Sequence, residues 1–531
     1  MTMLIRDLRL SLDEEETLLL NHAAKKLHLP EEALSHLRIR RMSLDARKKN
    51  DIHYKYTVSL EAWDEKKLLQ KKIPGVEPFL SALPDPPRHG TRSLRNRPVV
   101  VGAGPSGMFA ALALAREGYC PLLLERGAPV EKRVTSVETF WNGGPLDPDC
   151  NVLFGEGGAG TFSDGKLTTR IKDPRCESIL EDLVRFGAPE DCAYAAKPHI
   201  GTDILRQVVS RIRTEIESLG GEYLFHTRLT GIVIKDGILA ALETPAGLVE
   251  TNACILAVGH SARDVYQMLF KKGLDLRPKP FAVGVRIEHP QRLIDASQYG
   301  KLAGHPRLGA AEYHLATKDG CRGVYTFCMC PGGRVVASSS EEGGVVTNGM
   351  SFHARNEANA NAAIVVQVDP EDFGTSPLDG VVFQQRMEKA AFAAGGHSYY
   401  APAQKVGDFL HCQPSRTFSE VQPSYRPGVV PSDLHEILPD FIAHGISEAL
   451  PRFGQMLRGY DIGEALLTGV ETRTSSPVRI QREESGTAPG LDGLYPAGEG
   501  AGYAGGIVSA AVDGLRAAHN LIEHFAPPSR T

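Results

Sequence analysis

Residues 99–107 read Val-Val-Val-Gly-Ala-Gly-Pro-Ser-Gly, an apolar run that leads into three glycines with the spacing G-x-G-x-x-G. The apolar segment that follows, residues 108–116, suits a buried helix. Strand, glycine turn and helix in this order are typical of a turn that binds the pyrophosphate of a dinucleotide. Gly102 permits the tight turn, Gly104 lets the backbone approach the pyrophosphate, and Gly107 lets the helix pack against the sheet. The stretch therefore predicts a Rossmann-like domain.

A carboxylate follows this turn at the distance that a dinucleotide-binding domain requires. Residues 120–126 form a second apolar run that leads to Glu125, close to the spacing of about 20 residues at which an acid reaches the ribose. We interpret Glu125 as the ribose ligand of an adenosine and place Arg126 beside the adenine. A solvated acid after an ordinary glycine-rich turn is the alternative interpretation.

The second half of a dinucleotide site lies near the end of the chain. Residues 495–507 read Tyr-Pro-Ala-Gly-Glu-Gly-Ala-Gly-Tyr-Ala-Gly-Gly-Ile, and an apolar helical pattern continues to residue 518. The N-terminus of such a helix favours a negatively charged group. Together, the two glycine-rich stretches predict an FAD site that is built from both ends of the chain.

The composition indicates a protein of several domains. The chain has 531 residues, 42% of them hydrophobic, and its net charge is -5, so bulk charge favours neither nucleic acid nor an anionic membrane. The N-terminus lacks a secretory pattern and no apolar run suits a membrane span, so we expect a cytoplasmic protein. Nine cysteines, an odd number, fit reduced thiols better than a disulfide framework.

Four segments are expected along the chain. Residues 1–85 alternate like strands around one helical segment and predict a small N-terminal α+β domain. Residues 95–275 are the first part of the FAD-binding domain, residues 276–455 an inserted β-rich substrate or cap domain, and residues 456–531 the C-terminal part of the FAD-binding domain. The expected fold class is thus α/β, with a Rossmann-like FAD-binding domain that is split in sequence.

The whole chain resembles a known family. The order of its glycine-rich stretches is similar to that of the two-dinucleotide-binding-domain flavoproteins. Further strings resemble a bacterial family labelled uncharacterised FAD-dependent dehydrogenases. The matching segments are residues 43–49, 154–167, 258–264, 284–290, 327–333 and 472–477. The resemblance implies FAD as the cofactor and a dehydrogenase-like activity, and it implies no particular substrate.

Carried over residue by residue, the resemblance implies the contacts to FAD. Leu229 would contact the adenine through its backbone, and Glu499 stands where many relatives have aspartate. Residues 155–166 resemble the glycine-rich loop that wraps the isoalloxazine ring, with a mobile loop as the alternative interpretation. We name this segment the ring loop. The predicted contacts beyond Gly102, Gly104, Gly107, Glu125 and Arg126 are Gly157, Gly158, Gly160, Thr161, Leu229, Gly498, Glu499, Gly505, Gly506 and Ile507.

Polar side chains near the expected ring are the candidates for catalysis. We select Asp164 and Lys166 in the ring loop and His260 after an apolar strand. Arginine side chains match carboxylates and phosphates, so a small, anionic substrate is one expectation. Structural ion pairs are the alternative role of these residues. The arginines in question are Arg286, Arg473 and Arg479.

Cys328 and Cys330 are interpreted as buried strand thiols. A flavin-linked disulfide relay is the alternative, and the absence of cysteine from residues 155–166 argues against it. Cys321 adds a third thiol, which is too few ligands for a metal site, so no metal is expected.

The favoured function is an FAD-dependent oxidoreductase that transfers a hydride between the flavin and a small organic substrate. No second G-x-G-x-x-G follows an apolar run that could form a strand. NAD(P)H therefore stays a possible reductant, which would bind without a Rossmann domain of its own. The alternatives are a flavin monooxygenase and a flavoprotein of RNA modification or protein recruitment. The latter would use the basic N-terminal cluster, where few aromatic side chains support nucleic-acid binding. This cluster comprises Arg38, Arg40, Arg41, Arg47, Lys48 and Lys49.

Overall fold

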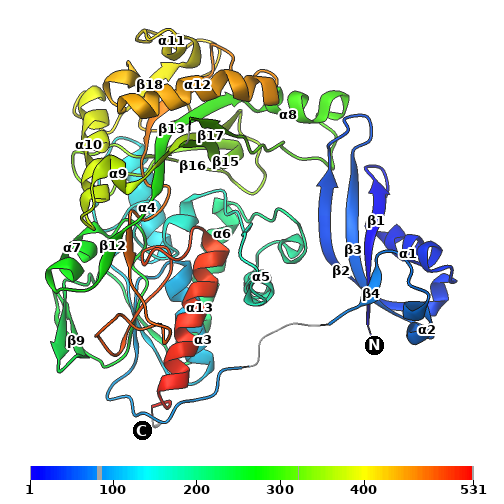
Figure 1. The fold of residues 1–531 in the computed structure, drawn as a ribbon, viewed down its shortest axis with the longest axis horizontal. Helices are drawn as coiled ribbons and strands as arrows, with labels where there is room; N and C mark the ends of the chain where they lie inside the picture. The colour runs from blue at the N-terminus through cyan, green and yellow to red at the C-terminus, as the bar shows by residue number, and fades with distance from the viewer. Residues whose placement is uncertain (1, 81–85, 321, 529–531) are drawn as a thin grey trace.

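The computed structural model describes residues 2–80, 86–320 and 322–528. A small N-terminal unit lies to one side of a parallel sheet with its helices, and a large, mostly antiparallel sheet lies above that parallel sheet (Figure 1). The predicted α/β fold, with a split Rossmann-like domain and a β-rich insertion, is confirmed. The domain boundary at residue 85 and Cys321 lie outside the described residues.

The N-terminal unit is an antiparallel sheet covered by short helices, in the strand order β2-β3-β1-β4. Apolar side chains of β1 and α1, such as Ile5 and Leu27, are fully buried between sheet and helix. This alternation of buried and exposed positions is the reason why the sequence predicted strands here. The elements are β1 (Met3–Ser11), α1 (Leu19–Leu27), β2 (Leu34–Asp45), β3 (His53–Ala62), α2 (Glu65–Gln70) and β4 (Val76–Pro78).

Some side chains of the basic N-terminal cluster already have partners within the protein. Arg40 donates to Ser59 and lies 3.5 Å from Glu177 of the neighbouring domain. Arg47 forms an ion pair with Asp45. Recruitment of RNA or of another protein by this cluster stays a prediction.

The FAD-binding domain is built on the strand order β22-β11-β5-β6-β7, and all its neighbouring strands are parallel. The late strand β22 thus returns to the sheet of the early strand β5 and pairs with β11, which lies between them. This return of the chain to the FAD-binding domain is what the sequence predicted. The domain consists of β5 (Val99–Val101), α3 (Pro105–Arg116), β6 (Leu122–Leu124), α4 (Val130–Trp141), α5 (Arg175–Arg185), α6 (Thr202–Ser218), β7 (Glu222–Leu224), β11 (Cys254–Leu256), α7 (Arg263–Lys271), β22 (Leu494–Pro496) and α13 (Ile507–His524), with a side sheet of β8 (Gly231–Lys235), β9 (Ile238–Thr244) and β10 (Gly247–Glu250).

The cap domain is the large sheet, in the order β14-β15-β17-β13-β20-β18-β19, with β16 paired to β15. Helix α12 lies across this sheet (Figure 1). The elements are β13 (Phe281–Pro290), α8 (Gln291–Tyr299), β14 (Ala316–Asp319), β15 (Arg322–Ala337), β16 (Thr347–Met350), β17 (Asn359–Val368), α9 (Pro370–Phe373), α10 (Asp379–Ala394), β18 (Ala401–Lys405), α11 (Val406–Leu410), β19 (Val429–Pro431), α12 (Asp440–Met456) and β20 (Leu466–Glu471).

Strand β20 extends the cap domain beyond the boundary at residue 455 that the sequence led us to expect. It pairs with β13 and β18, so the chain leaves the large sheet only after Glu471. A two-stranded ribbon of β12 (Leu276–Pro278) and β21 (Val478–Ile480) then carries the chain between the domains. The pairing of β20 joins segments far apart in sequence, and local patterning does not specify such partners.

Helix α4 of the FAD-binding domain packs into the core of the cap domain. Val137, Phe140 and Trp141 are buried in the same apolar cluster as the cap strands. The Trp141 indole donates a 2.9 Å hydrogen bond to the carbonyl of Ala337. Since each such buried side chain contributes about 1.5–3 kcal/mol, α4 fixes the two domains against each other. Within residues 2–80, 86–320 and 322–528, no helix has both the length and the apolar character to cross a bilayer.

Candidate active site

A cavity of about 390 Å³ lies between the parallel sheet and the cap domain. Val101, Leu124 and Ala257, at the carboxyl ends of β5, β6 and β11, line it. This edge is where open α/β sheets bind their ligands. The cavity continues past the ring loop to polar residues of the cap domain.

The phosphate turn has the geometry that its sequence predicted. Gly102 has a φ of +100°, a conformation that favours glycine. A Cβ on Gly107 would lie 1.8 Å from the Gly102 carbonyl oxygen, so this position needs glycine for close packing. A Cβ on Gly104 would have only Gly158 Cα nearby, at 3.8 Å. The free space beside Gly104 belongs to the cavity, where a pyrophosphate could approach the backbone.

Glu125 holds the phosphate turn and the ring loop together. Its buried carboxylate accepts hydrogen bonds from the backbone N–H groups of Ala103, Gly127 and Gly155, at 2.8, 2.9 and 3.0 Å. A carboxylate has about four lone-pair positions, so one acceptor position remains for a ribose hydroxyl. Arg126 lies 4.2 Å from the centre of the Phe154 ring and lines the cavity beside Leu229.

The ring loop packs directly on the phosphate turn. The N–H of Gly157 donates to the carbonyl of Ala103 at 2.7 Å, and Gly158 lies against Gly104. Gly158 and Gly160 line the cavity. Four predicted FAD contacts do not line the cavity but lie behind it: Gly107, Gly157, Thr161 and Gly498. The small glycines permit close packing there, and Thr161 forms a buried hydrogen bond, so these residues support the turns that line the cavity.

The late stretch brings Glu499, Gly505, Gly506 and Ile507 to the cavity. Burial raises the pKa of Glu499 to about 7, although the charge of Lys279 opposes this rise. Its Oε2 lies 3.7 Å from Nδ1 of His260. Glu499 can therefore take up or release a proton near neutral pH.

The three candidate catalytic residues all line the cavity. Asp164 is buried between Arg355 and Lys166, at 3.0 and 3.3 Å. Burial alone would raise the pKa of Asp164, but these two charges outweigh it and lower the pKa to about 2. In turn, Asp164 keeps the pKa of Lys166 above its usual value in spite of burial. The pair therefore presents a charged ammonium group at neutral pH.

His260 is neutral at this site. Burial and the charges of Arg473 and Arg263 lower its pKa to about 3. Its Nε2 is buried and has no hydrogen-bond partner among the described residues. The imidazole can thus offer a hydrogen bond to a bound molecule, and it is too weak a base to be charged at neutral pH.

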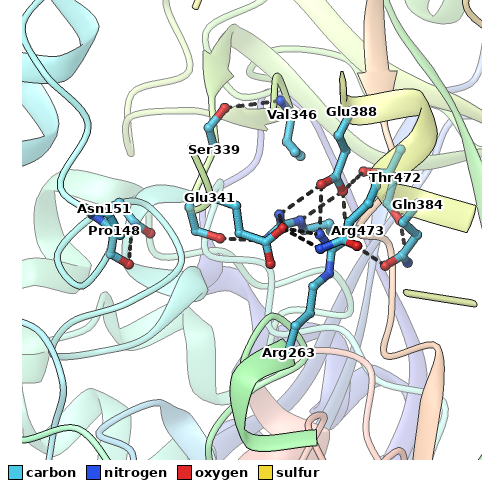
Figure 2. A network of polar contacts seen from close by, with 12 residues as sticks. Pro148, Asn151, Arg263, Ser339, Glu341, Val346, Gln384, Glu388, Thr472 and Arg473 are labelled. Carbon is cyan, nitrogen blue, oxygen red and sulfur yellow. Dashed lines mark hydrogen bonds and ion pairs between the residues drawn. The ribbon is translucent and has the colours of Figure 1, made fainter. Parts of the chain in front are cut away.

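Arg473 reaches the cavity, but carboxylates of the protein already neutralise its charge. Glu388 of α10 accepts hydrogen bonds from Arg473 and from Arg263 of α7 (Figure 2). Arg473 also donates a 2.6 Å hydrogen bond to Ser340. Thr472 donates a further 2.7 Å hydrogen bond to Glu388. The network joins the FAD-binding domain to the cap domain at the edge of the site.

The other two arginines do not line the cavity. Arg286 forms two 2.9 Å bonds with the carboxylate of Glu471, and both side chains are buried. Arg479 donates to the carbonyl of Gly502 and lies 5.0 Å from the Tyr503 ring centre. Lys166 is therefore a better candidate than these arginines for an anionic group of a substrate.

The structure adds cap residues that sequence reasoning did not select for the site. Cys328 and Asn348 line the cavity together with Glu471 and Thr474. A bulge in β15 places Cys328 there, and no local pattern of the sequence predicts this bulge. Its one signal was the Cys-x-Cys spacing with Cys330.

The residues present fit FAD. Besides the open position at Gly104, the cavity exposes buried polar atoms that have no hydrogen-bond partner among the described residues. They are Ser106 Oγ, Lys166 Nζ, His260 Nε2 and Ser261 Oγ, and all four residues line the cavity. Buried polar atoms in proteins normally have partners, so their free positions indicate a polar ligand. No group of described residues forms a metal site.

Comparison with known proteins agrees with this geometry. Residues 280–474 match the family model described as FAD-dependent protein, C-terminal domain-like, and residues 2–61 match a domain of unknown function, DUF8436. A Clostridium beijerinckii protein described as uncharacterized is 48% identical over 540 residues, covering 99% of this chain and 100% of that protein. The chain belongs to this bacterial family of FAD-dependent proteins. FAD is its cofactor.

Other similarities are weaker. Protein FixC of Escherichia coli K12 is 28% identical over 204 residues, which are 37% of this chain and 44% of FixC. Glycine oxidase of Bacillus cereus overlays with a TM-score of 0.36 at 10% identity, over 81% of this chain and 98% of the oxidase. Within the family, the matched residues 280–474 coincide with the large sheet from β13 to β20, which supports the later end of the cap domain.

Replacing Glu125 with glutamine tests its role in holding the phosphate turn and the ring loop together. The amide nitrogen cannot accept a hydrogen bond, so one of the three buried N–H groups loses its acceptor. We expect a loss of about 1–3 kcal/mol in the free energy of unfolding and about tenfold weaker FAD binding. Urea unfolding and FAD titration of the apoprotein measure both. Glu250→Gln, at an exposed position, is the matched control, and equal behaviour of the two variants would contradict the assigned role.

Proposed function

We propose that this protein transfers a hydride between its FAD and a small organic substrate at the junction of the FAD-binding and cap domains. The observation that carries the proposal is the continuous cavity that runs from the phosphate turn to polar residues of the cap domain. When bound, FAD supplies the hydride chemistry, and the protein supplies position and electrostatics.

The polar residues have distinct proposed roles. Lys166, kept charged by Asp164, binds an anionic group of the substrate. His260, which stays neutral, orients the substrate through a hydrogen bond. Glu499 takes up or releases the proton that accompanies hydride transfer, because its pKa lies near neutral pH.

The visible spectrum of the purified protein tests this proposal. We expect a flavin band that bleaches on anaerobic addition of one donor among NADPH, NADH and a series of small carboxylates. Rapid bleaching by a nicotinamide would identify a reductase or a monooxygenase, and oxygen consumption with substrate would separate the two. A flavin that all three donor classes leave oxidised would contradict hydride transfer with small molecules.

Lys166→Ala and His260→Ala are expected to slow flavin reduction by about 100-fold while FAD stays bound. The reason is that each variant loses a polar contact to the substrate and keeps the phosphate turn intact. Stopped-flow absorbance measures the rate, and the flavin-to-protein ratio measures retention. Lys172→Ala, an exposed neighbour in sequence, is the control. Unchanged rates in both variants would remove these residues from the active site.

A further inference from the structure

Strand β15 carries two cysteines at a bulge that opens toward the FAD cavity. Phe327 pairs with Ala363 and Cys330 with Asn361, so β15 contains one residue more than β17 between these pairs. Cys328 lies inside the bulge with a φ of +44°, which is unfavourable for any residue except glycine. Bulges re-aim side chains and are frequent beside active sites. Here the bulge brings Cys328 to the cavity lining.

Cys330, the second cysteine, lies close to Cys328. Cys330 is fully buried, and its Sγ lies 3.3 Å from the carbonyl oxygen of Cys328. Only Met329 separates the two residues in sequence. Both are free thiols in this structure. One partly buried thiol on the cavity lining and one buried thiol at this spacing have the arrangement of an attacking and a resolving cysteine.

A hydrogen bond and two positive charges favour a thiolate at Cys328. A hydrogen bond from Cys330 lowers the pKa of Cys328 well below its usual range, and the charges of Arg286 and Lys166 add to this effect against burial. Arg286 also donates 2.8 Å to the Cys328 carbonyl. Cys330 responds in the opposite direction, because a neighbouring thiolate and burial raise its pKa. A thiolate is the form that attacks disulfides and gives up electrons.

We propose that Cys328 and Cys330 are a redox-active pair that exchanges two electrons with FAD and takes thiols as its substrates. In this step the Sγ–Sγ bond forms between a Cys328 thiolate and a Cys330 thiol, and two electrons and one proton leave the pair. Reduction of oxidised FAD to its anionic reduced form consumes the same two electrons and one proton. A substrate thiolate then attacks the disulfide and a second substrate thiol completes the exchange, so two substrate thiols become one disulfide. This inference rests on the proposed function, because FAD is the electron acceptor.

Peptide mapping tests the pair directly. Cleavage after arginine releases residues 323–334, which contain Cys328 and Cys330 and no other cysteine. We expect this peptide from the air-oxidised holoprotein to resist alkylation and to be lighter by two hydrogen atoms. After treatment with dithiothreitol it should carry two alkyl groups. Full alkylation of the peptide in the air-oxidised protein would overturn the proposal.

Anaerobic reduction by dithiothreitol tests the link to FAD. We expect the wild-type flavin band to bleach, and Cys328→Ser and Cys330→Ser to bleach more than about tenfold more slowly. Cys412→Ser, at an exposed cysteine, should behave as wild type. Equal bleaching in all four proteins would overturn electron transfer through the pair.

The same variants separate this inference from the proposed function. If the pair alone is misassigned, Cys330→Ser and the wild type are reduced equally by dithiothreitol, while a hydride donor still bleaches both. If the proposed function fails, no hydride donor bleaches the flavin in any of these proteins, whatever the state of the peptide.

Discussion

Glu388→Ala is expected to lower the free energy of unfolding by about 3–5 kcal/mol. The change removes the buried carboxylate that lies 2.8 and 3.1 Å from the guanidinium groups of Arg263 and Arg473 (Figure 2). It leaves them the partly exposed Glu341, at 2.9 and 4.0 Å, as their carboxylate partner. Removing one partner of a buried ion pair costs more than the pair contributes, because the remaining charge has no solvent. Urea unfolding at neutral pH measures the loss.

Two further variants define the cause. Glu388→Gln keeps the shape and one acceptor oxygen, so its loss should be smaller than that of the alanine variant. Glu342→Ala, at an exposed position, should change stability by less than about 0.5 kcal/mol. A Glu388→Ala protein as stable as the Glu342→Ala control would show that water or other side chains neutralise the two arginines.

The contribution of Glu388 should depend on pH in one direction. Burial by itself raises the pKa of Glu388, but the charges of Arg473 and Arg263 outweigh it and hold the pKa well below its usual range. A carboxylate with a lowered folded-state pKa stabilises the protein above the unfolded value of about 4.3 and loses this effect as the pH falls below it. The difference in stability between wild type and Glu388→Gln should therefore stay constant from pH 7 to about pH 5 and shrink as the pH falls further.

Gly104→Ala is expected to weaken FAD binding by about 100-fold or more, which corresponds to about 2.7 kcal/mol. Gly104 is not in a conformation that excludes alanine, and its nearest neighbour would lie 3.8 Å from the new Cβ. The protein should therefore fold normally. The methyl group would, however, occupy the place where the backbone approaches the pyrophosphate. Fluorescence titration of the apoprotein with FAD measures the affinity.

The matched control for this variant is Gly463→Ala. Its Cβ would lie 3.6 Å from Gly407 Cα, an ordinary contact away from the cavity lining. Both apoproteins should melt close to the wild type, and only Gly104→Ala should lose FAD. Equal FAD affinity of the two variants would mean that the pyrophosphate does not approach Gly104.

Local sequence determined the parts of the site that adjoin one another along the chain. The glycine spacing from Gly102 to Gly107 specified a strand, a turn and a helix. The tight turn, the approach of the backbone to the pyrophosphate and the packing of the helix on the sheet all involve residues within this short segment. The spacing to Glu125 placed the acid at the end of the neighbouring strand for the same reason. The late stretch from Gly498 to Ile507 was recognisable because its turn and the helix that follows are also local.

Tertiary structure alone decided what faces these elements across the cavity. The sequence suggested Arg473 as a ligand of the substrate, but α10 brings Glu388 to it, and the charge is neutralised within the protein. Strand β20 joins the large sheet because β13 and β18 offer free edges, a choice that depends on segments far apart in sequence. Cys328 lines the same cavity as Lys166 only because a bulge turns β15 toward it. These contacts depend on how distant surfaces pack, and a local pattern of side chains carries no information about its distant partners.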